Sequence, residues 1–529
     1  MPCPSFNSAT FPIDGVNPRS ITAADFDVDG NIDLAVANFN SDNVSILLGN
    51  GTGGFVLAPG SPFPTGGDTP VSIITADFNE DGKIDLAVAN FNTFNVSILL
   101  GDGTGGFAPV LGSPFPTGGF GPSSIIAADF DGDGHIDFAV SNANSNNVSV
   151  FLGNGTGGFA PAPGSPFLTG GSFPNSITAA DFNGNGIIDL AVLNQASNNV
   201  SVLLGNGAGS FAPAPGSPFP TGGTAGTTIT AADFNGDGKI DVAVSNQITD
   251  NVSVLLGNGA GSLAPAPGSP FPAGVDVPTS ITTADFNCDG KIDFAVSGGN
   301  NVSVLLGDGT GSFVSAPGSP FSTGGIGAVS LTAADFNDDG SIDLATANFF
   351  SNNVSILINE CIPVITCPDD ITAANDTNLC GSVVNYPTPM VTDNCIGATA
   401  SCSPASGSFF PVGPTTVTCN LTDASGIIID SCSFTVTVND TQPPVIICPD
   451  NITVFNDPGS NGAMVNYPPP TVSDNCPGVT SVCTPASGSF FPPGTTIVTC
   501  TATDAAGNTS TCSFNVRVIT DPCRFFSNR

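Results

Sequence analysis

The segment "ADFDVDGNIDLAV", residues 24–36, decides how this chain folds. Its aspartates stand at positions 1, 3, 5 and 9 of a loop that starts at Asp25, and Gly30 stands at position 6, where the chain must turn sharply. An EF-hand would carry Glu at position 12, but this chain has Val36 there, and "LAV" leaves no room for an exiting helix. The spacing therefore predicts a calcium-type loop within a β-hairpin.

The composition of the 529 residues favours a folded, all-β protein. Hydrophobic residues make up 40% of the chain, 65 Gly and 46 Pro indicate many turns, and helix-type amphipathic stretches are scarce. The formal charge of -37 excludes nucleic acid and anionic membrane surfaces as natural partners and favours divalent cations. No apolar run reaches the roughly 18 residues of a membrane span. The start "MPCPSFNSAT" does not resemble a signal peptide, so we expect a removed leader or a fragment.

The opening loop recurs seven times along the first 360 residues. Its leading aspartates are separated by 52 residues five times and then by 50, at Asp25, Asp77, Asp129, Asp181, Asp233, Asp285 and Asp335. Each unit contains an alternating run before the loop, two further strand-like runs such as "IDVAVSN" and "NVSVLLG", and a Pro-rich fourth run. Four short strands in a unit of this length are typical of a propeller blade.

The two ends of this region predict how the ring closes. The seventh unit stops after its third strand-like run, "NVSILIN", whereas "ATFPIDGVNP" at the N-terminus matches the fourth-strand segment "SPFPTGGDTP" at an offset of 52 residues. Pairing the N-terminal strand into the last blade would remove an open sheet edge. We therefore predict a seven-bladed β-propeller over residues 1–360.

Each loop supplies candidate ligands for one calcium ion, up to seven in all. Positions 1, 3, 5 and 9 offer carboxylate or amide oxygens, and position 7 offers its backbone carbonyl. The predicted metal ligands are Asp25, Asp27, Asp29, Asn31 and Asp33; Asp77, Asn79, Asp81, Lys83 and Asp85; Asp129, Asp131, Asp133, His135 and Asp137; Asp181, Asn183, Asn185, Ile187 and Asp189; Asp233, Asn235, Asp237, Lys239 and Asp241; Asp285, Asn287, Asp289, Lys291 and Asp293; and Asp335, Asn337, Asp339, Ser341 and Asp343. The fourth loop has only two carboxylates and should bind most weakly.

Two other repeated motifs have structural interpretations that outweigh the functional ones. "GNGTGG" at residues 49–54 matches the dinucleotide-binding pattern in form, but it follows a third strand and leads into no helix, so it predicts a hairpin turn. "NVS" in every unit is a glycosylation sequon in form, whereas its Asn also suits the turn before a strand. The single histidine, His135, lies in a loop and is interpreted as solvent-facing rather than catalytic.

From Cys361 a different repeat begins, with a period of 81 residues. Thirteen of the fifteen cysteines lie from this point on, without the His partners or CxxC pairs of zinc sites, which indicates disulfides and an oxidising, extracellular setting. About seven strand-like runs per copy predict two immunoglobulin-like sandwiches, at 361–441 and 442–522, before a tail at 523–529. The Pro-stiffened linker at 439–445 predicts a semi-rigid stalk.

The cysteine pattern also predicts particular disulfides. Cys402–Cys419 and Cys483–Cys500 join segments that one sheet would place side by side, Cys395–Cys432 and Cys476–Cys512 are weaker inferences, and Cys367–Cys380 is left by elimination. Cys448 and Cys523 stay unassigned, because Asn461 replaces Cys380 in the second copy. Ring closure would bring Cys3 beside Cys361, leaving Cys288 as a free thiol.

These motifs resemble two known families. "TITAADFNGDGKIDVAVSN" at residues 228–246 and "NNVSVFLGNGTGGF" at residues 146–159 resemble FG-GAP/VCBS repeats, the blades of integrin-α-like propellers, which implies calcium ligands at positions 1, 3, 5 and 9. The elements "DNC", "SGSFFP", "VTC" and "CSF" resemble HYR (hyalin repeat) modules, which implies extracellular adhesion. Neither family is enzymatic by itself, and one His, two Tyr and no Trp leave the usual catalytic constellations without members.

The functional prediction is therefore a secreted or cell-surface, calcium-binding adhesion protein that is not an enzyme, within an extracellular filament or matrix. Its partner would be an extracellular protein or glycan, and self-association stays open. The alternative is a carbohydrate-binding or accessory module of an extracellular polysaccharide-active enzyme.

Overall fold

The computed structural model describes residues 4–361, 363–392, 398–422 and 426–520. Strands, turns and bends account for this part of the chain, and no helix in it could cross a membrane. The all-β prediction is confirmed. Contacts separate two units, the seven repeats and the pair of C-terminal repeats, and each is described by itself.

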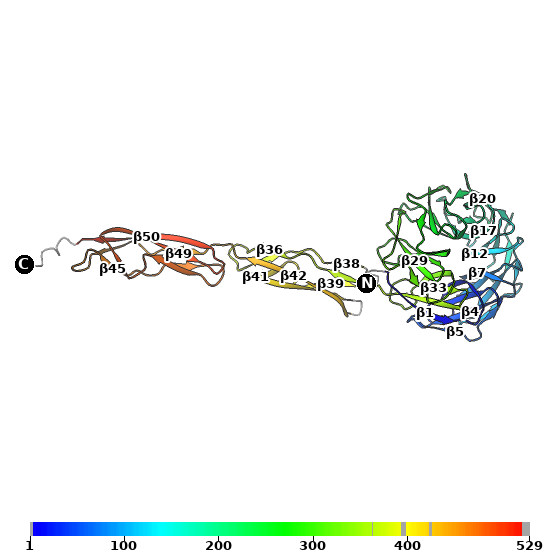
Figure 1. Ribbon diagram of the computed structural model, residues 1–529, viewed down its shortest axis with the longest axis horizontal. Coiled ribbons are helices and arrows are strands. Elements are labelled where there is room, and N and C mark those ends of the chain that lie inside the picture. Colours follow the sequence, from blue (N-terminus) through cyan, green and yellow to red (C-terminus); the bar gives the residue numbers. More distant parts are fainter. Residues whose placement is uncertain (1–3, 362, 393–397, 423–425, 521–529) are drawn as a thin grey trace, which may run out of the picture. The chain divides into compact units, whose positions relative to one another are not determined.

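Seven antiparallel sheets form the blades of the first unit, arranged as a ring (Figure 1). The strands at the centre of the ring are β2 (Pro18–Ala24), β7 (Pro70–Ala76), β12 (Pro122–Ala128), β17 (Pro174–Ala180), β22 (Gly226–Ala232), β27 (Pro278–Ala284) and β32 (Ala328–Ala334). The second strands are β3 (Asp33–Asn38), β8 (Asp85–Asn90), β13 (Asp137–Asn142), β18 (Asp189–Asn194), β23 (Asp241–Asn246), β28 (Asp293–Gly298) and β33 (Asp343–Asn348). The third strands are β4 (Asn43–Gly49), β9 (Asn95–Gly101), β14 (Asn147–Gly153), β19 (Asn199–Gly205), β24 (Asn251–Gly257), β29 (Asn301–Gly307) and β34 (Asn353–Asn359).

The Pro-rich outer segment forms two short strands in six blades, where the sequence predicted one. Both pair with the third strand, because the intervening "APG" or "SPF" residues cannot continue a ladder. The longer pieces are β5 (Phe55–Leu57), β10 (Phe107–Pro109), β15 (Phe159–Pro161), β20 (Phe211–Pro213), β25 (Leu263–Pro265) and β30 (Phe313–Ser315). The shorter pieces are β6 (Phe63–Pro64), β11 (Phe115–Pro116), β16 (Phe167–Leu168), β21 (Phe219–Pro220), β26 (Phe271–Pro272) and β31 (Phe321–Ser322).

The last blade receives its outer strand from the N-terminus of the chain. Strand β1 (Phe6–Pro12) pairs antiparallel with β34 over seven residues, from Phe6 opposite Asn359 to Pro12 opposite Asn353. The amide of Glu360 also donates to the carbonyl of Ser5 at 2.7 Å. The two ends of the ring are therefore held to one another by a backbone ladder.

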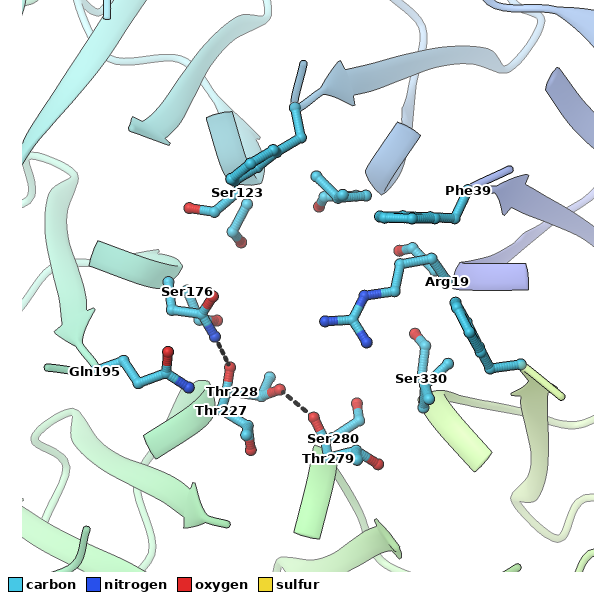
Figure 2. Close-up of a pocket in the computed structure, with 18 of the residues that line it drawn as sticks. Arg19, Phe39, Ser123, Ser176, Gln195, Thr227, Thr228, Thr279, Ser280 and Ser330 are labelled. Atoms are coloured by element: carbon cyan, nitrogen blue, oxygen red, sulfur yellow. Dashed lines mark hydrogen bonds between the residues drawn. The ribbon is translucent and has the colours of Figure 1, made fainter. Parts of the chain in front are cut away.

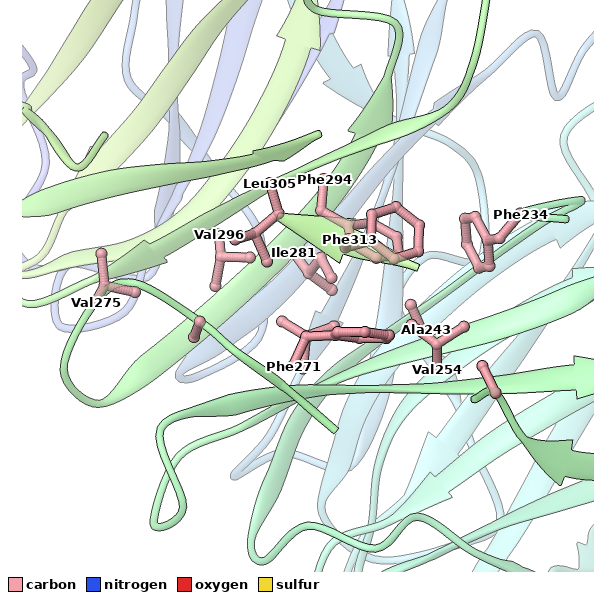
Figure 3. Packing of buried hydrophobic residues seen from close by; sticks show 13 residues of the cluster. Phe234, Ala243, Val254, Phe271, Val275, Ile281, Phe294, Val296, Leu305 and Phe313 are labelled. Carbon is pink, nitrogen blue, oxygen red and sulfur yellow. The ribbon is translucent and has the colours of Figure 1, made fainter. Parts of the chain in front are cut away.

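Buried side chains between adjacent blades make the core of the ring. Every residue of the second strands is buried, because blades pack against both faces of "DLAVAN"-type segments. Figure 3 shows the cluster between the fifth and sixth blades, where Phe234, Phe294 and Phe313 pack on Val254 and Ile281. Similar clusters recur around the ring, so each blade is stabilised by its two neighbours.

The second unit contains two copies of a small β-sandwich-like domain. In the first copy β36 (Ile371–Ala374), β42 (Ile428–Asn439), β41 (Gly413–Thr422) and β39 (Thr399–Ser403) form one sheet, and two strand pairs join β35 (Val364–Thr366) to β38 (Met390–Thr392) and β37 (Gly381–Val384) to β40 (Ser408–Pro411). The second copy repeats this arrangement. Its four-stranded sheet contains β44 (Ile452–Phe455), β50 (Thr509–Ile519), β49 (Gly494–Thr503) and β47 (Thr480–Thr484). Its two strand pairs join β43 (Val445–Ile447) to β46 (Thr471–Ser473) and β45 (Ala463–Val465) to β48 (Ser489–Phe491).

The disulfides of this unit confirm the predicted sheet pairs. Cys402–Cys419 and Cys483–Cys500 each join residues that lie opposite one another in adjacent antiparallel strands. They hold β39 to β41 and β47 to β49.

The weaker pairings are wrong. Cys432 bonds Cys367 rather than Cys395, and Cys512 bonds the unassigned Cys448 rather than Cys476, because each partner shortly precedes the strand, β36 or β44, that runs parallel to the last strand of its domain. Cys380 bonds Cys476, which links the two domains, whereas the second copy has Asn461 at the position equivalent to Cys380.

The predictions for the remaining cysteines have mixed outcomes. Cys288 is disulfide-bonded, so its assignment as a free thiol is wrong; it lies half-buried in the turn of the sixth acidic loop. Cys361 is also disulfide-bonded, but the predicted partner Cys3 lies outside the described residues, as do Cys395 and Cys523.

Candidate functional site

The seven acidic loops share one backbone shape. In each loop the amide of the glycine at position 6 donates to the carboxylate at position 1, at 2.7–3.0 Å. The amide at position 7 likewise donates to the side chain at position 5. The glycine at position 6 has a positive φ throughout, for example 93° at Gly30. The side-chain oxygens at positions 1 and 5 thus also fix the turn.

The aspartate at position 9 is the buried member of each loop. Asp33 is completely buried, and its two oxygens accept from the amides of Phe26 at 2.8 Å and Gly49 at 2.7 Å. Equivalent bonds recur in the other loops, with Asn359 replacing glycine in the last. Burial raises the pKa of Asp33 to about 6, and that of Asp293 and Asp343 to about 7. A nearby cation would favour the ionised form of these groups.

The loops differ in how many carboxylates they bring together. Oxygens of Asp25, Asp27 and Asp29 lie within 4.8 Å of one another, and so do oxygens of Asp129, Asp131 and Asp137. These are the first and third loops, which have four aspartates each. Among the seven acidic loops, these two therefore place the most carboxylates at positions 1, 3, 5 and 9.

The fourth loop is satisfied internally. Its position-3 residue, Asn183, donates its amide to Asp189 at 3.0 Å, so a side-chain N–H group takes part of the role that a cation would have. That this loop binds metal most weakly stays a prediction.

The basic residues at position 7 contact carboxylates. Lys83, Lys239 and Lys291 pair with the position-5 aspartate of their own loops at 3.8, 3.0 and 3.2 Å. His135 instead reaches Glu80 of the preceding loop at 2.5 Å, and this bond raises the histidine pKa. These exposed pairs contribute little to stability. The loop pattern predicted only the backbone carbonyls of these residues as ligands and gave no sign of the ion pairs.

The glycine-rich turns connect neighbouring blades, and the hairpin-turn interpretation is confirmed. The amide of Gly105 in the second unit donates to the carbonyl of Phe26 in the first acidic loop at 3.1 Å. The same bond recurs around the ring, and Gly53 of the first unit reaches Phe336 of the seventh. Where the seventh unit lacks the turn, the side chain of Asn359 donates to Phe286 at 2.9 Å. Each acidic loop is thereby fixed by the next blade.

The asparagines of the "NVS" motifs also have a structural role. The side-chain oxygen of Asn43 accepts from the amide of Asn38 at 2.9 Å, and the same pair recurs in five other blades. Ser45 of the motif is completely buried. The motif therefore holds the turn between the second and third strands, while its glycosylation stays a prediction.

A pocket of about 610 Å³ lies at the centre of the ring, lined by the first strands of all seven blades (Figure 2). Hydroxyl and amide groups dominate its wall, and several of them bond to the next blade. Asn175 donates to the Thr227 carbonyl at 2.9 Å, and Thr228 donates to the Thr279 carbonyl at 3.1 Å. The wall is therefore both polar and well ordered.

Arg19 is the cationic side chain of this pocket. Figure 2 shows its guanidinium directed into the pocket near Phe39. No hydrogen bond or ion pair of this side chain occurs within the described residues, and the surrounding protein lowers its pKa. Although the chain as a whole carries a net charge of -37, this unpaired guanidinium can bind an anionic group inside the pocket.

Sequence reasoning missed Arg19, although the repeat contains a signal for it. The equivalent position in the other six units carries Val, Ser, Asn or Thr, at Val71, Ser123, Asn175, Thr227, Thr279 and Val329. A charged residue at one of seven equivalent sites is a departure that blade stability does not require.

Family models match both regions of the chain. The FG-GAP-like repeat model matches residues 25–88, 77–140, 129–192, 181–244, 233–296 and 286–346, six overlapping windows that include all seven loops. The HYR domain model matches residues 360–438 and 439–518. The chain therefore belongs to the FG-GAP-like repeat family and carries two HYR domains.

Particular relatives share part of this organisation. Hyalin of Strongylocentrotus purpuratus is 38% identical over 30% of this chain and 14% of its own length, and hyalin of Lytechinus variegatus is 36% identical over 33% and 34%. The chain thus spans well under two thirds of these curated relatives. Among solved structures, BBS1N from its complex with ARL6DN is similar at a TM-score of 0.46 and 13% identity, covering 67% of this chain and 97% of that one.

Proposed function

We propose that this chain is an extracellular, calcium-stabilised protein of the adhesion type, whose propeller binds a protein or glycan. The observation that carries the proposal is the buried aspartate at position 9 of all seven loops, beside the carboxylates or amides at positions 1, 3 and 5. Burying a carboxylate next to other acidic groups is costly unless a cation lies among them. Oxygen donors at these positions suit calcium.

The extracellular setting is supported by the disulfides. Five described disulfides hold or connect the HYR domains, and such bonds persist in oxidising compartments. The similarity to hyalins, which covers 30% and 33% of this chain, supports an adhesion-type role in the same extracellular setting. Membership of a filament or matrix, and the absence of enzymatic activity, belong to this proposal.

Thermal unfolding in calcium and in chelator tests the metal part of the proposal. In chelator, the first unfolding transition of the full chain should move to a much lower temperature. Readdition of calcium should restore the original temperature. An unchanged transition would mean that the loops are only acidic hairpins.

The central pocket favours the second candidate function, carbohydrate binding. Its hydroxyl and amide wall matches sugar hydroxyls, and Arg19 matches a sugar carboxylate or sulfate. On a glycan array, the wild-type chain should bind acidic glycans, and Arg19→Ser, which copies the third blade, should weaken binding by roughly 10-fold to 100-fold. Arg517→Ser is the matched control, because it removes the same charge from an exposed site of the last HYR strand. Equal binding by R19S would reject the pocket as the site.

A further inference from the structure

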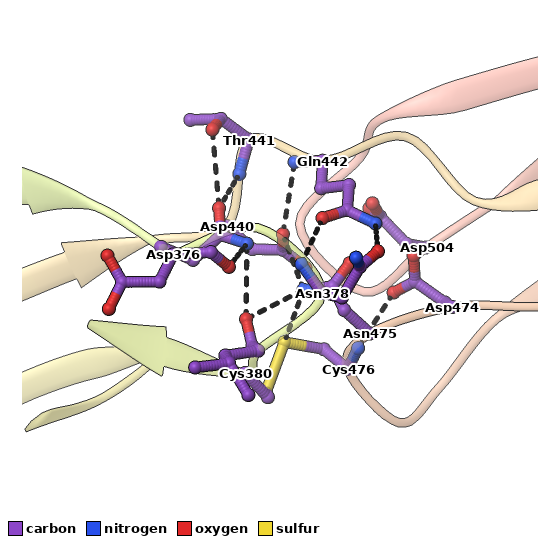
Figure 4. The surroundings of a disulfide bond; sticks show 12 residues. Asp376, Asn378, Cys380, Asp440, Thr441, Gln442, Asp474, Asn475, Cys476 and Asp504 are labelled. Carbon is purple, nitrogen blue, oxygen red and sulfur yellow. Dashed lines mark hydrogen bonds between the residues drawn. A yellow bond between two sulfur atoms is a disulfide. The ribbon is translucent and has the colours of Figure 1, made fainter. Parts of the chain in front are cut away.

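Three aspartates come together where the two HYR domains are joined. Asp440 lies between β42 and β43, Asp474 follows β46 and Asp504 follows β49, and one oxygen of each lies within 4.8 Å of the others. The Cys380–Cys476 disulfide connects the domains beside them (Figure 4). Residues far apart in the sequence therefore concentrate three carboxylates at one junction.

The cluster contains one buried carboxylate oxygen without a partner, and a second carboxylate oxygen, on a buried aspartate, that accepts no hydrogen bond within the described residues. Asp440 and Asp504 are only 8% and 6% exposed. The hydrogen bonds to the Asp440 side chain, from Gln442 and Asn475 at 3.2 Å each, both reach Oδ1, so Oδ2 has no partner within the described residues. Oδ1 of Asp474 is inaccessible to solvent and also lacks a hydrogen-bond partner there. An unsatisfied, buried carboxylate oxygen is unfavourable and calls for a cation or donor.

Within the described residues, no basic side chain forms an ion pair with these three aspartates. The three lysines and the histidine of the chain all precede residue 300, and Arg517 lies on the exposed face of β50. Asn475 and Asn508 provide amide donors, which satisfy single oxygens but leave the negative charge in place. Like charges at this distance repel strongly in a poorly solvated site. In the described part of the chain these carboxylates therefore lack a neutralising charge, and a cation from solution can supply one.

We propose that Asp440, Asp474 and Asp504 bind a calcium ion at the junction of the two HYR domains. Carboxylate oxygens from three separate segments can adapt to the irregular, oxygen-only coordination of this ion. Binding would tie the interdomain segment at Asp440 to two loops of the second HYR domain. The site is independent of the propeller loops and of the function proposed for them.

Hydrogen exchange of the full chain tests the site locally. In wild-type protein, calcium should slow exchange at least 10-fold in peptides covering residues 439–446 and 474–478, compared with chelator. Asp474→Asn should abolish this protection. Asp450→Asn is the matched control, because it removes one charge at an exposed position of the same domain, and it should retain the protection.

The wild-type comparison decides the proposal even where a variant folds poorly. Equal exchange of these peptides in calcium and in chelator would overturn it. So would protection that persists in D474N, or protection produced equally by magnesium. Because the readout comes from HYR peptides, failure of calcium binding in the propeller would be seen separately, in peptides of the acidic loops.

Discussion

The propeller and the HYR pair reach a stable β structure by different means. The propeller contains seven small sheets whose cores are shared between neighbours and whose acidic loops are copied in register. The HYR domains have small sheets in which disulfides join neighbouring strands, and one further disulfide connects the two domains. Repetition spreads stability around a ring, whereas cross-links fix particular strands. Removing calcium should therefore destabilise mainly the propeller, whereas removing disulfides should destabilise mainly the HYR domains.

Calcium removal should have the largest effect, and on the propeller. A site filled at a hundred times its dissociation constant contributes about 2.7 kcal/mol, and several such sites act on one cooperative ring. We expect the propeller transition to fall by more than about 10 °C in chelator, while the HYR transition moves much less. Differential scanning calorimetry of the full chain measures both. Equal shifts of the two transitions would contradict the comparison.

The pH dependence of the calcium-free propeller should be the next largest effect. The raised pKa values of the position-9 aspartates, to about 6 or 7, mean that the folded state holds protons that the unfolded state releases. Stability from these groups is present below about pH 4 and is lost as pH rises to about 6 or 7. The stability lost per group would be at most about 3 kcal/mol where the pKa rises to about 6, and at most about 4 kcal/mol where it rises to about 7.

Denaturant unfolding in chelator at pH 4.5, 5.5 and 6.5 checks whether propeller stability declines as pH rises. Calcium should remove the decline, because it binds the ionised aspartates. A calcium-free propeller that becomes more stable over this interval would show that the buried carboxylates are ionised without metal.

Loss of one HYR disulfide should be smaller and confined to its domain. Replacing Cys402 and Cys419 with Ala opens a loop of 17 residues, which costs about 3 kcal/mol in the entropic model. We expect the transition of the first HYR domain to fall and that of the propeller to stay in place. The equivalent change at Cys483 and Cys500 is the control, since it should lower the second domain instead.

Differences among the acidic loops should be the smallest effect. Asp129→Asn with Asp133→Asn should lower propeller stability in calcium by about 2 kcal/mol, because it removes two carboxylates from a four-carboxylate loop. Asp181→Asn with Asp189→Asn should reduce calcium binding less, because the side chain of Asn183 already donates a hydrogen bond to Asp189. Calcium stoichiometry by titration calorimetry separates the two, and equal loss of bound ions would contradict the ranking.

Repetition explains which features the sequence could predict. Seven copies in register reveal the strands, the loops and the missing outer strand that β1 supplies. Single-copy features give no such signal: Arg19 needs its neighbours in the pocket, and Asp440, Asp474 and Asp504 are separated by 34 and 30 residues with no shared motif. The pairing of Cys380 was wrong because its partner lies in another domain, where no pattern internal to one copy can find it.

The closure of the last blade determines how the ring would carry tension. A pull transmitted from the HYR domains along the chain reaches the propeller at residue 361, directly after β34. That strand lies inside its sheet, between β33 and β1, so it can leave only if both ladders break. Because β1 belongs to the opposite end of the chain, the load is shared with the first blade, through the segment that leads from Pro12 into β2. The joint between the first and last strands of the propeller is thus an anchor that resists extraction, and mechanical strength at residue 361 depends on residues 6–12.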